Sequence, residues 1–422
     1  MRRSVIFLLA ALIAALAWTA STGAQEEVEI RASDAQSEFP DGIVFTLEAA
    51  GAGIEEIRLI HKLAPDGVRA SSIADCSGGT VMSCTFELAA NRRNLLIPGA
   101  EVTFFWRITV DGVTQETAPQ LVTYDDDRFD WEQLSDGNLT LWSYRGSDDE
   151  RRLVLAAGRE SLDTIGDLLQ TEVDFPVKIL YYASRGDMGP AIITDDREGV
   201  VTLGEVVYSD TAMVSAEAAP EEIARHEIAH IVVRQALQGP YGVPDWLNEG
   251  TAVFAQTQPL ADQRQAVERA IESGRVLSLR SLSSATSGTI AGGVSLFYGQ
   301  SWSLVAFLVE VHGEEQFAQL FQAFQEGAGT DEALEQVYGF DLDGLEDAWR
   351  ESIGLPPRQV PTPEEERVPS PDAIATPETE AAPSPSDDSG LSGALIVAVA
   401  ALAILLAGGL LGAALIVARR YR

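Results

Sequence analysis

Two short stretches decide how the middle of this 422-residue chain folds: His-Glu-Ile-Ala-His at residues 226–230 and Pro-Asp-Trp-Leu-Asn-Glu-Gly at residues 244–250. Side chains four residues apart on a helix lie on the same side, so His226 and His230 can both offer an imidazole nitrogen to one metal ion. The first stretch therefore predicts a helix that carries two metal ligands. A polar helix exposed to solvent is the alternative that this pattern leaves open when taken alone.

The residues just before this stretch favour a helix. Pro220 suits the first helical turn, and the acidic Glu221 and Glu222 complement the positive end of the helix dipole. Glu227 follows the first histidine and can take a proton from a metal-bound water. The sequence thus offers two ligands and a general base, and it still needs a third ligand.

The second stretch supplies that ligand by resemblance. The two motifs together resemble the gluzincin zinc metallopeptidases, the Trp-Leu-Asn-Glu-Gly segment resembles that of the M1 aminopeptidases, and the nearest match is the broader set of peptidase MA-like domains. The resemblance covers roughly residues 128–353. It implies that Glu249 is the third ligand of one Zn²⁺ per chain, and that the chain hydrolyses peptide bonds with a zinc-activated water.

The resemblance also implies roles around the metal. Glu227 would act as the general base, and Tyr298, in Phe-Tyr-Gly-Gln-Ser-Trp, would donate a hydrogen bond to the oxyanion of the tetrahedral intermediate. A core aromatic at the start of a helix is the alternative for Tyr298. The aminopeptidases carry a Gly-x-Met-Glu-Asn strand that holds a free amino terminus, whereas Thr211–Ser215 here has no acidic residue. We therefore expect an endopeptidase.

Outward from these motifs the chain divides into segments of different composition. Residues 25–125 alternate apolar and polar side chains and contain an Asp111-Gly112 hairpin turn, which predicts an all-β sandwich of the immunoglobulin or fibronectin type. Residues 126–355 predict an α+β domain with a small sheet followed by helices, and this is the part that resembles a gluzincin metallopeptidase. Residues 356–390 are rich in Pro, Glu and Ser and predict an extended, disordered stalk.

The two ends predict export and a membrane anchor. Residues 1–24 have the order of charge, apolar core and small residues of a secretory signal peptide, although an uncleaved anchor is the alternative. Residues 391–418 are uncharged and long enough for a single transmembrane helix, and the basic tail at 419–422 predicts a cytoplasmic C-terminus with the preceding domains outside the cell membrane. Gly408 and Gly412 could support a weak homodimer.

The remaining features narrow the partners. A formal net charge of −35 excludes a nucleic-acid partner, so the expected partners are a peptide or protein substrate and the membrane.

Cys76 and Cys84 could form a local disulfide or remain free thiols. We interpret His61 and His312 as structural. A catalytically silent zinc-binding or adhesion protein, displayed on a stalk, is the alternative function.

Overall fold

The computed structural model describes residues 28–64, 67–91, 94, 96–192, 204–208, 210–238, 242–284 and 293–358. The predicted signal peptide (1–24), the stalk beyond Arg358, the transmembrane helix (391–418), the tail (419–422) and the glycine pair Gly408 and Gly412 lie outside these residues.

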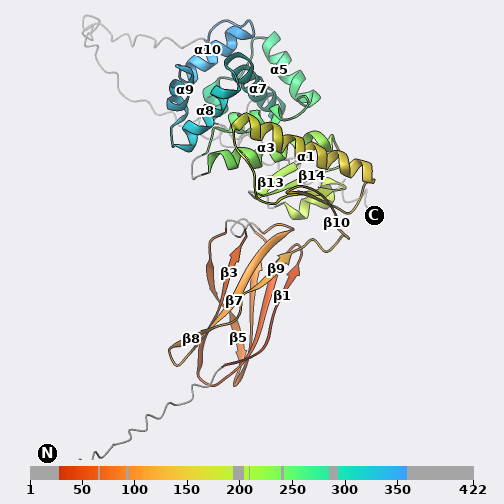
Figure 1. Ribbon diagram of the computed structural model, residues 1–422, viewed down its shortest axis with the longest axis vertical. Coiled ribbons are helices and arrows are strands. Elements are labelled where there is room, and N and C mark those ends of the chain that lie inside the picture. The colour runs from red at the N-terminus through yellow and green to blue at the C-terminus, as the bar shows by residue number, and fades with distance from the viewer. Residues whose placement is uncertain are drawn as a thin grey trace, which may run out of the picture. The chain divides into compact units, whose positions relative to one another are not determined.

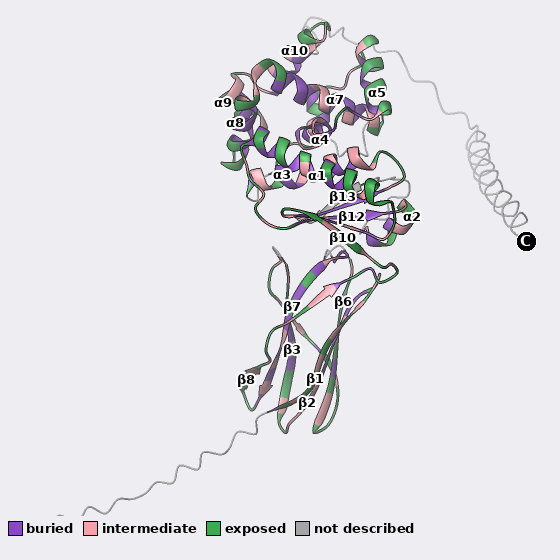
Figure 2. Cartoon of the chain, turned by 45° about the vertical axis from the view of Figure 1, so that its right-hand side comes forward, coloured by how far each residue is buried: buried purple, intermediate pink, exposed green. Residues whose placement is uncertain are grey.

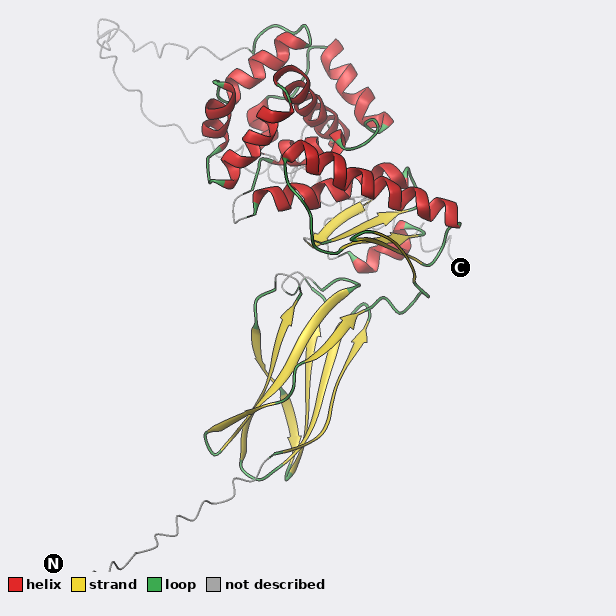
Figure 3. Cartoon of the chain, viewed as in Figure 1, coloured by secondary structure: helices red, strands yellow, loops and turns green. Residues whose placement is uncertain are grey.

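The N-terminal part of the chain is a two-sheet β-structure (Figures 1 and 3). One sheet has the order β1-β2-β6-β5, and the other has the order β4-β3-β7-β8 with β9 also paired to β7. All of these pairs are antiparallel. The strands are β1 (Glu29–Glu38), β2 (Gly42–Ala50), β3 (Ile54–Leu63), β4 (Ala70–Ile73), β5 (Asp75–Gly78), β6 (Val81–Ala89), β7 (Ala100–Val110), β8 (Val113–Glu116) and β9 (Gln120–Tyr124).

The alternation along β7 shows why these strands form a sandwich. Every second residue of Ala100–Val110 is buried, and Phe104 of this strand packs edge-on against Phe45 of the other sheet, with ring centroids 4.9 Å apart. The side chains of the two sheets thus share one core. Asp111 and Gly112 both have positive φ and connect β7 to β8, as the hairpin prediction required. The prediction of an all-β N-terminal domain is confirmed.

The two cysteines are joined. Cys76 on β5 lies opposite Cys84 on β6, and the two form a disulfide. The sequence left this open, because spacing alone does not show that two residues face each other across a strand pair.

A five-stranded sheet and two long helices open the second domain. The sheet has the order β10-β11-β12-β14-β13, in which β11, β12 and β14 are parallel and the two outer strands are antiparallel to their neighbours. The strands are β10 (Glu132–Asp136), β11 (Leu139–Ser143), β12 (Val177–Tyr182), β13 (Gly204–Tyr208) and β14 (Thr211–Ser215). Helices α1 (Asp148–Leu169) and α3 (Pro220–Leu237) cover one face (Figure 1).

Close packing brings α1 onto this sheet. A Cβ atom at Gly158 of α1 would lie 2.8 Å from Cδ1 of Ile179 on β12, so a larger residue at this crossing would require the Ile179 side chain to move. Asn138, in the turn before β11, donates from its side-chain amide to the carbonyl oxygens of Val173 and Phe175. These two hydrogen bonds of Asn138 fix the turn that leads into β11.

The rest of the domain is helical, as expected after Pro220. The helices are α4 (Asp245–Phe254), α5 (Ala261–Glu272), α6 (Leu279–Ser284), α7 (Val294–Phe307), α8 (Glu314–Gln325), α9 (Thr330–Tyr338) and α10 (Leu342–Ser352). Helix α7 continues into a π-helical turn at Leu308–His312. The combined segment Val294–His312 is long and apolar enough for a membrane span, but 56% of its most apolar window is buried inside the domain, as in a core helix (Figure 2).

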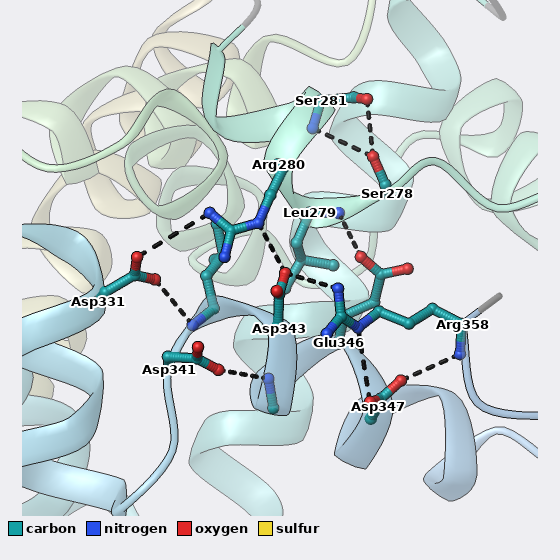
Figure 4. A network of polar contacts seen from close by, with 12 residues as sticks. Ser278, Leu279, Arg280, Ser281, Asp331, Asp341, Asp343, Glu346, Asp347 and Arg358 are labelled. Carbon is teal, nitrogen blue, oxygen red and sulfur yellow. Dashed lines mark hydrogen bonds and ion pairs between the residues drawn. The ribbon is translucent and has the colours of Figure 1, made fainter. Parts of the chain in front are cut away.

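A network of arginines and acids fixes the end of this helical part (Figure 4). Asp343 of α10 accepts a hydrogen bond from Arg280 of α6 at 2.7 Å and pairs with Arg358 at 2.8 Å. Glu346, which is buried, accepts from the backbone nitrogen of Leu279 at 2.9 Å. The chain is thus held against α10 as far as Arg358.

A second network occupies the segment between β9 and β10. The carboxylate of Asp126 is fully buried and accepts hydrogen bonds from Arg128 at 2.6 Å and from Tyr182 at 3.1 Å. The Arg128 guanidinium lies over the rings of Phe39 and Phe129. This segment is therefore packed and hydrogen-bonded.

Candidate metal centre

Helix α3 places the two predicted histidine ligands on one side. It begins at Pro220, with Glu221 and Glu222 in its first turn, as the sequence predicted. His226 and His230 lie one turn apart, and their side chains are only 10% and 13% exposed. The helix is buried on several sides between the sheet and the other helices, so its histidines lie at the edge of a packed core.

Helix α4 brings the third residue to the same place. Trp246 and Leu247 are buried and anchor the first turn of α4, and Glu249 follows with a side chain that is 19% exposed. Gly250 permits a close crossing with α7, because a Cβ atom there would lie 2.5 Å from the carbonyl oxygen of Ser301. The Asn-Glu-Gly sequence therefore combines a candidate ligand with the residue that lets its helix pack.

The three side chains converge on one point. The Nε2 atoms of His226 and His230 are 3.2 Å apart, and Oε2 of Glu249 lies 3.3 Å from the first and 3.4 Å from the second. Their ligand atoms all lie within 4.8 Å of one another, and they form the one group of this kind among the described residues. The structure thus brings together the three predicted ligands, although Glu249 lies 19 and 23 positions after the two histidines in the sequence.

The donor set fits a zinc ion. Oε2 of Glu249 is buried and has no hydrogen-bond partner among the described residues, although two imidazole nitrogens face it. Two histidines and one carboxylate, with a position left for water or substrate, are a known catalytic zinc set. A cation held by these three residues would satisfy an oxygen that is otherwise buried without a bond.

The electrostatics of the metal-free cluster point the same way. Burial lowers the pKa of His230, but the charges of Glu249 and Glu227 and the contact with Asn248 outweigh it, so the pKa is raised above its usual value. Burial raises the pKa of Glu249, but the two histidines outweigh it and hold the pKa well below its usual range. The site therefore favours a positive charge beside Glu249.

Asn248 is a site residue that the sequence interpretation missed. Its Oδ1 lies 3.0 Å from Nδ1 of His230. An amide oxygen can only accept, so Nδ1 donates and Nε2 is left with its lone pair toward the other ligands. The sequence signal that could have identified Asn248 is its position directly before Glu249. By contrast, Nδ1 of His226 is buried without a partner among the described residues.

The two other predicted site residues also lie at this cluster. Glu227 is 6% exposed, and its charge contributes to the raised pKa of His230. Tyr298 of α7 is partly buried, and its ring centroid lies 5.9 Å from that of His226. The structure therefore places Tyr298 next to a candidate ligand, although it also packs against the core.

The other histidines lie elsewhere. His61 packs against Phe86 inside the β-sandwich, with ring centroids 5.8 Å apart. His312 ends the π-helical turn and contacts Phe307, Tyr338 and Phe340. Both belong to aromatic packing, in agreement with their structural interpretation.

Comparison with known proteins identifies the class of this domain. Residues 158–354 match the family model of the Peptidase MA superfamily. This part of the chain is a peptidase MA-like domain, as the two motifs predicted. The match supports a metallopeptidase. No curated protein matches the chain.

Several solved structures show partial similarity. An aminopeptidase N family protein from Idiomarina loihiensis is 12% identical, with a TM-score of 0.33, over 72% of this chain and 73% of that one. A carbohydrate-binding module family 56 β-1,3-glucan binding domain is 16% identical, with a TM-score of 0.16, over 23% of this chain and 98% of that one. A family 64 laminaripentaose-producing β-1,3-glucanase from Paenibacillus barengoltzii is 17% identical, with a TM-score of 0.16. That match covers 27% of this chain and spans only 26% of the glucanase.

Proposed function

We propose that this chain is a zinc metallopeptidase of the gluzincin type that hydrolyses internal peptide bonds of a peptide or protein substrate. The observation that carries the proposal is the convergence of His226, His230 and Glu249 inside a domain of the Peptidase MA superfamily. The buried Oε2 of Glu249 at this point has no hydrogen-bond partner in the part of the chain that the structure describes.

In this proposal, one zinc ion per chain is held by His226, His230 and Glu249 and supplies Lewis-acid polarisation of the substrate carbonyl and acidification of a water molecule. Glu227 accepts the proton of the attacking water and passes it to the leaving amine. Its burial beside His226 suits this role, because a carboxylate shielded from bulk water interacts more strongly with the proton it transfers.

Two further residues act around the reaction. The Tyr298 hydroxyl donates a hydrogen bond to the oxygen that becomes negative as the carbonyl is attacked, a role that its position near His226 supports. Asn248 does not touch the substrate in this account. It fixes the orientation and tautomer of His230.

The preference for internal bonds is the finer part of the proposal. It rests on the absence of an acidic residue in Thr211–Ser215. This segment is β14, an interior strand paired with β12 and β13, and all five of its residues are buried. A residue that grips a substrate amine would have to come from another element, so matched peptides with free and acetylated amino termini are the direct test.

The cellular setting is proposed from the sequence. A signal peptide at 1–24, a stalk at 356–390, a transmembrane helix at 391–418 and a basic tail at 419–422 would display the catalytic domain outside the cell membrane in a single-pass arrangement. The β-sandwich would precede the catalytic domain in the sequence. A weak homodimer through Gly408 and Gly412 belongs to the same proposal.

Zinc content and peptide cleavage, measured on the same preparation, test the proposal. We expect about one zinc per chain by elemental analysis. We also expect cleavage of a mixed peptide library that a chelator abolishes and added zinc restores. A zinc-containing protein that cleaves no peptide would favour the alternative, a catalytically silent zinc-binding or adhesion protein. A protein without zinc after metal-replete expression would contradict both.

A further inference from the structure

Asp245 is an acidic residue beside the candidate metal centre to which no role has yet been assigned. It begins α4, one helical turn before Glu249, so the two side chains are neighbours on the same helix face. Asp245 is exposed, whereas Glu249 and Glu227 are mostly shielded. Asp245 is therefore a solvent-accessible carboxylate one helical turn from a candidate ligand.

The carboxylate of Asp245 is not used by the fold. Among the described residues it forms no hydrogen bond and no ion pair. Partial desolvation raises its pKa, and the negative charge of Glu249 raises it further. An acid at the start of a helix does complement the helix dipole, but that does not require a position beside a metal ligand.

Cations are scarce around this acid. Besides the candidate ligands His226 and His230, helices α3, α4 and α7 carry two basic side chains, Arg225 and Arg234. Arg225 is paired with Glu160 at 2.7 Å and with Glu222 at 3.2 Å. Arg234 lies in the last turn of α3 and forms no ion pair with Asp245. Neither arginine of these helices therefore neutralises Asp245.

The balance of charges around the metal centre gives Asp245 an effect on substrate specificity. The carboxylates of Glu249 and Glu227 together would balance a divalent zinc ion, so Asp245 adds a negative charge one helical turn from a centre that is otherwise balanced. We propose that Asp245 selects substrates that carry a cation close to the scissile bond. The cation is either a Lys or Arg side chain or the free amino terminus of the peptide. This inference rests on the proposed peptidase function and adds the charge of its substrates.

The expected effect is modest, because Asp245 is exposed. An exposed ion pair is worth at most about 1 kcal/mol, which corresponds to about fivefold in affinity. The two sources of the cation have different consequences. A bound side chain would give an endopeptidase with a preference for basic residues, whereas a bound amino terminus would give an exopeptidase.

Binding to the zinc-loaded, full-length Glu227→Gln protein tests this without depending on turnover. Four fluorescent peptides of one neutral sequence combine a free or acetylated amino terminus with Lys or Gln at an internal position. Further peptides place the Lys at other internal positions. We expect one of the two cations to lower Kd by about fivefold in fluorescence anisotropy. This gain should vanish when Asp245→Asn is added to Glu227→Gln. The gain should persist when Asp174→Asn is added instead, because this control removes an exposed acid in the loop after α1.

Equal Kd values for charged and neutral peptides, or no measurable binding of any peptide, would overturn the role of Asp245. A gain that survives Asp245→Asn would also overturn it, because the cation would then be bound by another group. Failure of the proposed function looks different: the wild-type chain would lack zinc, or its cleavage of peptides would not depend on Glu227.

Discussion

The Nδ1 atom of His230 lies 3.0 Å from Oδ1 of Asn248, the residue directly before Glu249. One turn of α4 thus supplies both a candidate ligand and the acceptor that orients another ligand on α3. The geometry of the centre depends on how α3, α4 and α7 cross.

Replacing Asn248 with Ala should weaken zinc binding. Loss of such a supporting hydrogen bond typically reduces metal affinity by about 10- to 100-fold, because the imidazole is no longer held in one tautomer and orientation. Competition with a chromophoric chelator measures the change. Asn248→Asp keeps an acceptor at this position and should retain most of the affinity. An Asn248→Ala protein with wild-type affinity would show that His230 needs no such support.

The crossing of α4 and α7 should tolerate no side chain at Gly250. A Cβ atom there would lie 2.5 Å from the Ser301 carbonyl oxygen and 2.8 Å from Cγ2 of Val305. Gly250→Ala should therefore destabilise the domain by about 1–3 kcal/mol and reduce zinc retention, since Glu249 is adjacent. Chemical denaturation and zinc analysis measure both effects. Gly242→Ala has nothing within 4 Å and is the control, so equal behaviour of the two variants would refute the packing argument.

Local sequence signals predicted much of this architecture. The helix that carries His226 begins at Pro220, as the sequence predicted. The candidate ligands could be identified because helical spacing and the two short motifs are local features of the sequence.

What the sequence did not predict depends on distant partners. The position of β14 between β12 and β13 depends on its pairing with β12 across more than thirty residues, so Thr211–Ser215 could not be recognised as an interior strand. The support of His230 by Asn248 depends on the approach of two helices. The burial of Asp126 against Arg128 and Tyr182 joins residues that have no common motif.

That last network gives a further prediction. Arg128→Ala would leave the Asp126 carboxylate, which is fully buried, without its charged partner. Removal of one member of a buried pair costs about 3–5 kcal/mol, and the partial exposure of Arg128 favours the lower value. Chemical denaturation should show a loss of about 3 kcal/mol. Arg152→Ala removes an exposed pair with Asp149 and should change stability by less than about 1 kcal/mol. Similar values for the two variants would contradict the role assigned to Asp126.

The proposed topology can be tested on intact cells. Protease added outside should release the catalytic domain by cutting between residues 361 and 386, because an extended Pro-, Glu- and Ser-rich segment offers unpacked chain. Immunoblotting of the medium measures the release. Protection in intact cells, with digestion only after lysis, would reverse the proposed orientation.

Glu227→Gln separates metal binding from catalysis and tests the central claim most directly. The amide keeps the shape of the side chain and leaves His226, His230 and Glu249 unchanged. We therefore expect zinc content and thermal stability close to those of the wild type, with a loss of peptide hydrolysis of at least about 100-fold in kcat. Glu326→Gln, at the exposed end of α8, is the control and should cleave like the wild type. A Glu227→Gln protein that cleaves peptides at the wild-type rate would contradict the account, because the activity would then arise without the proposed base.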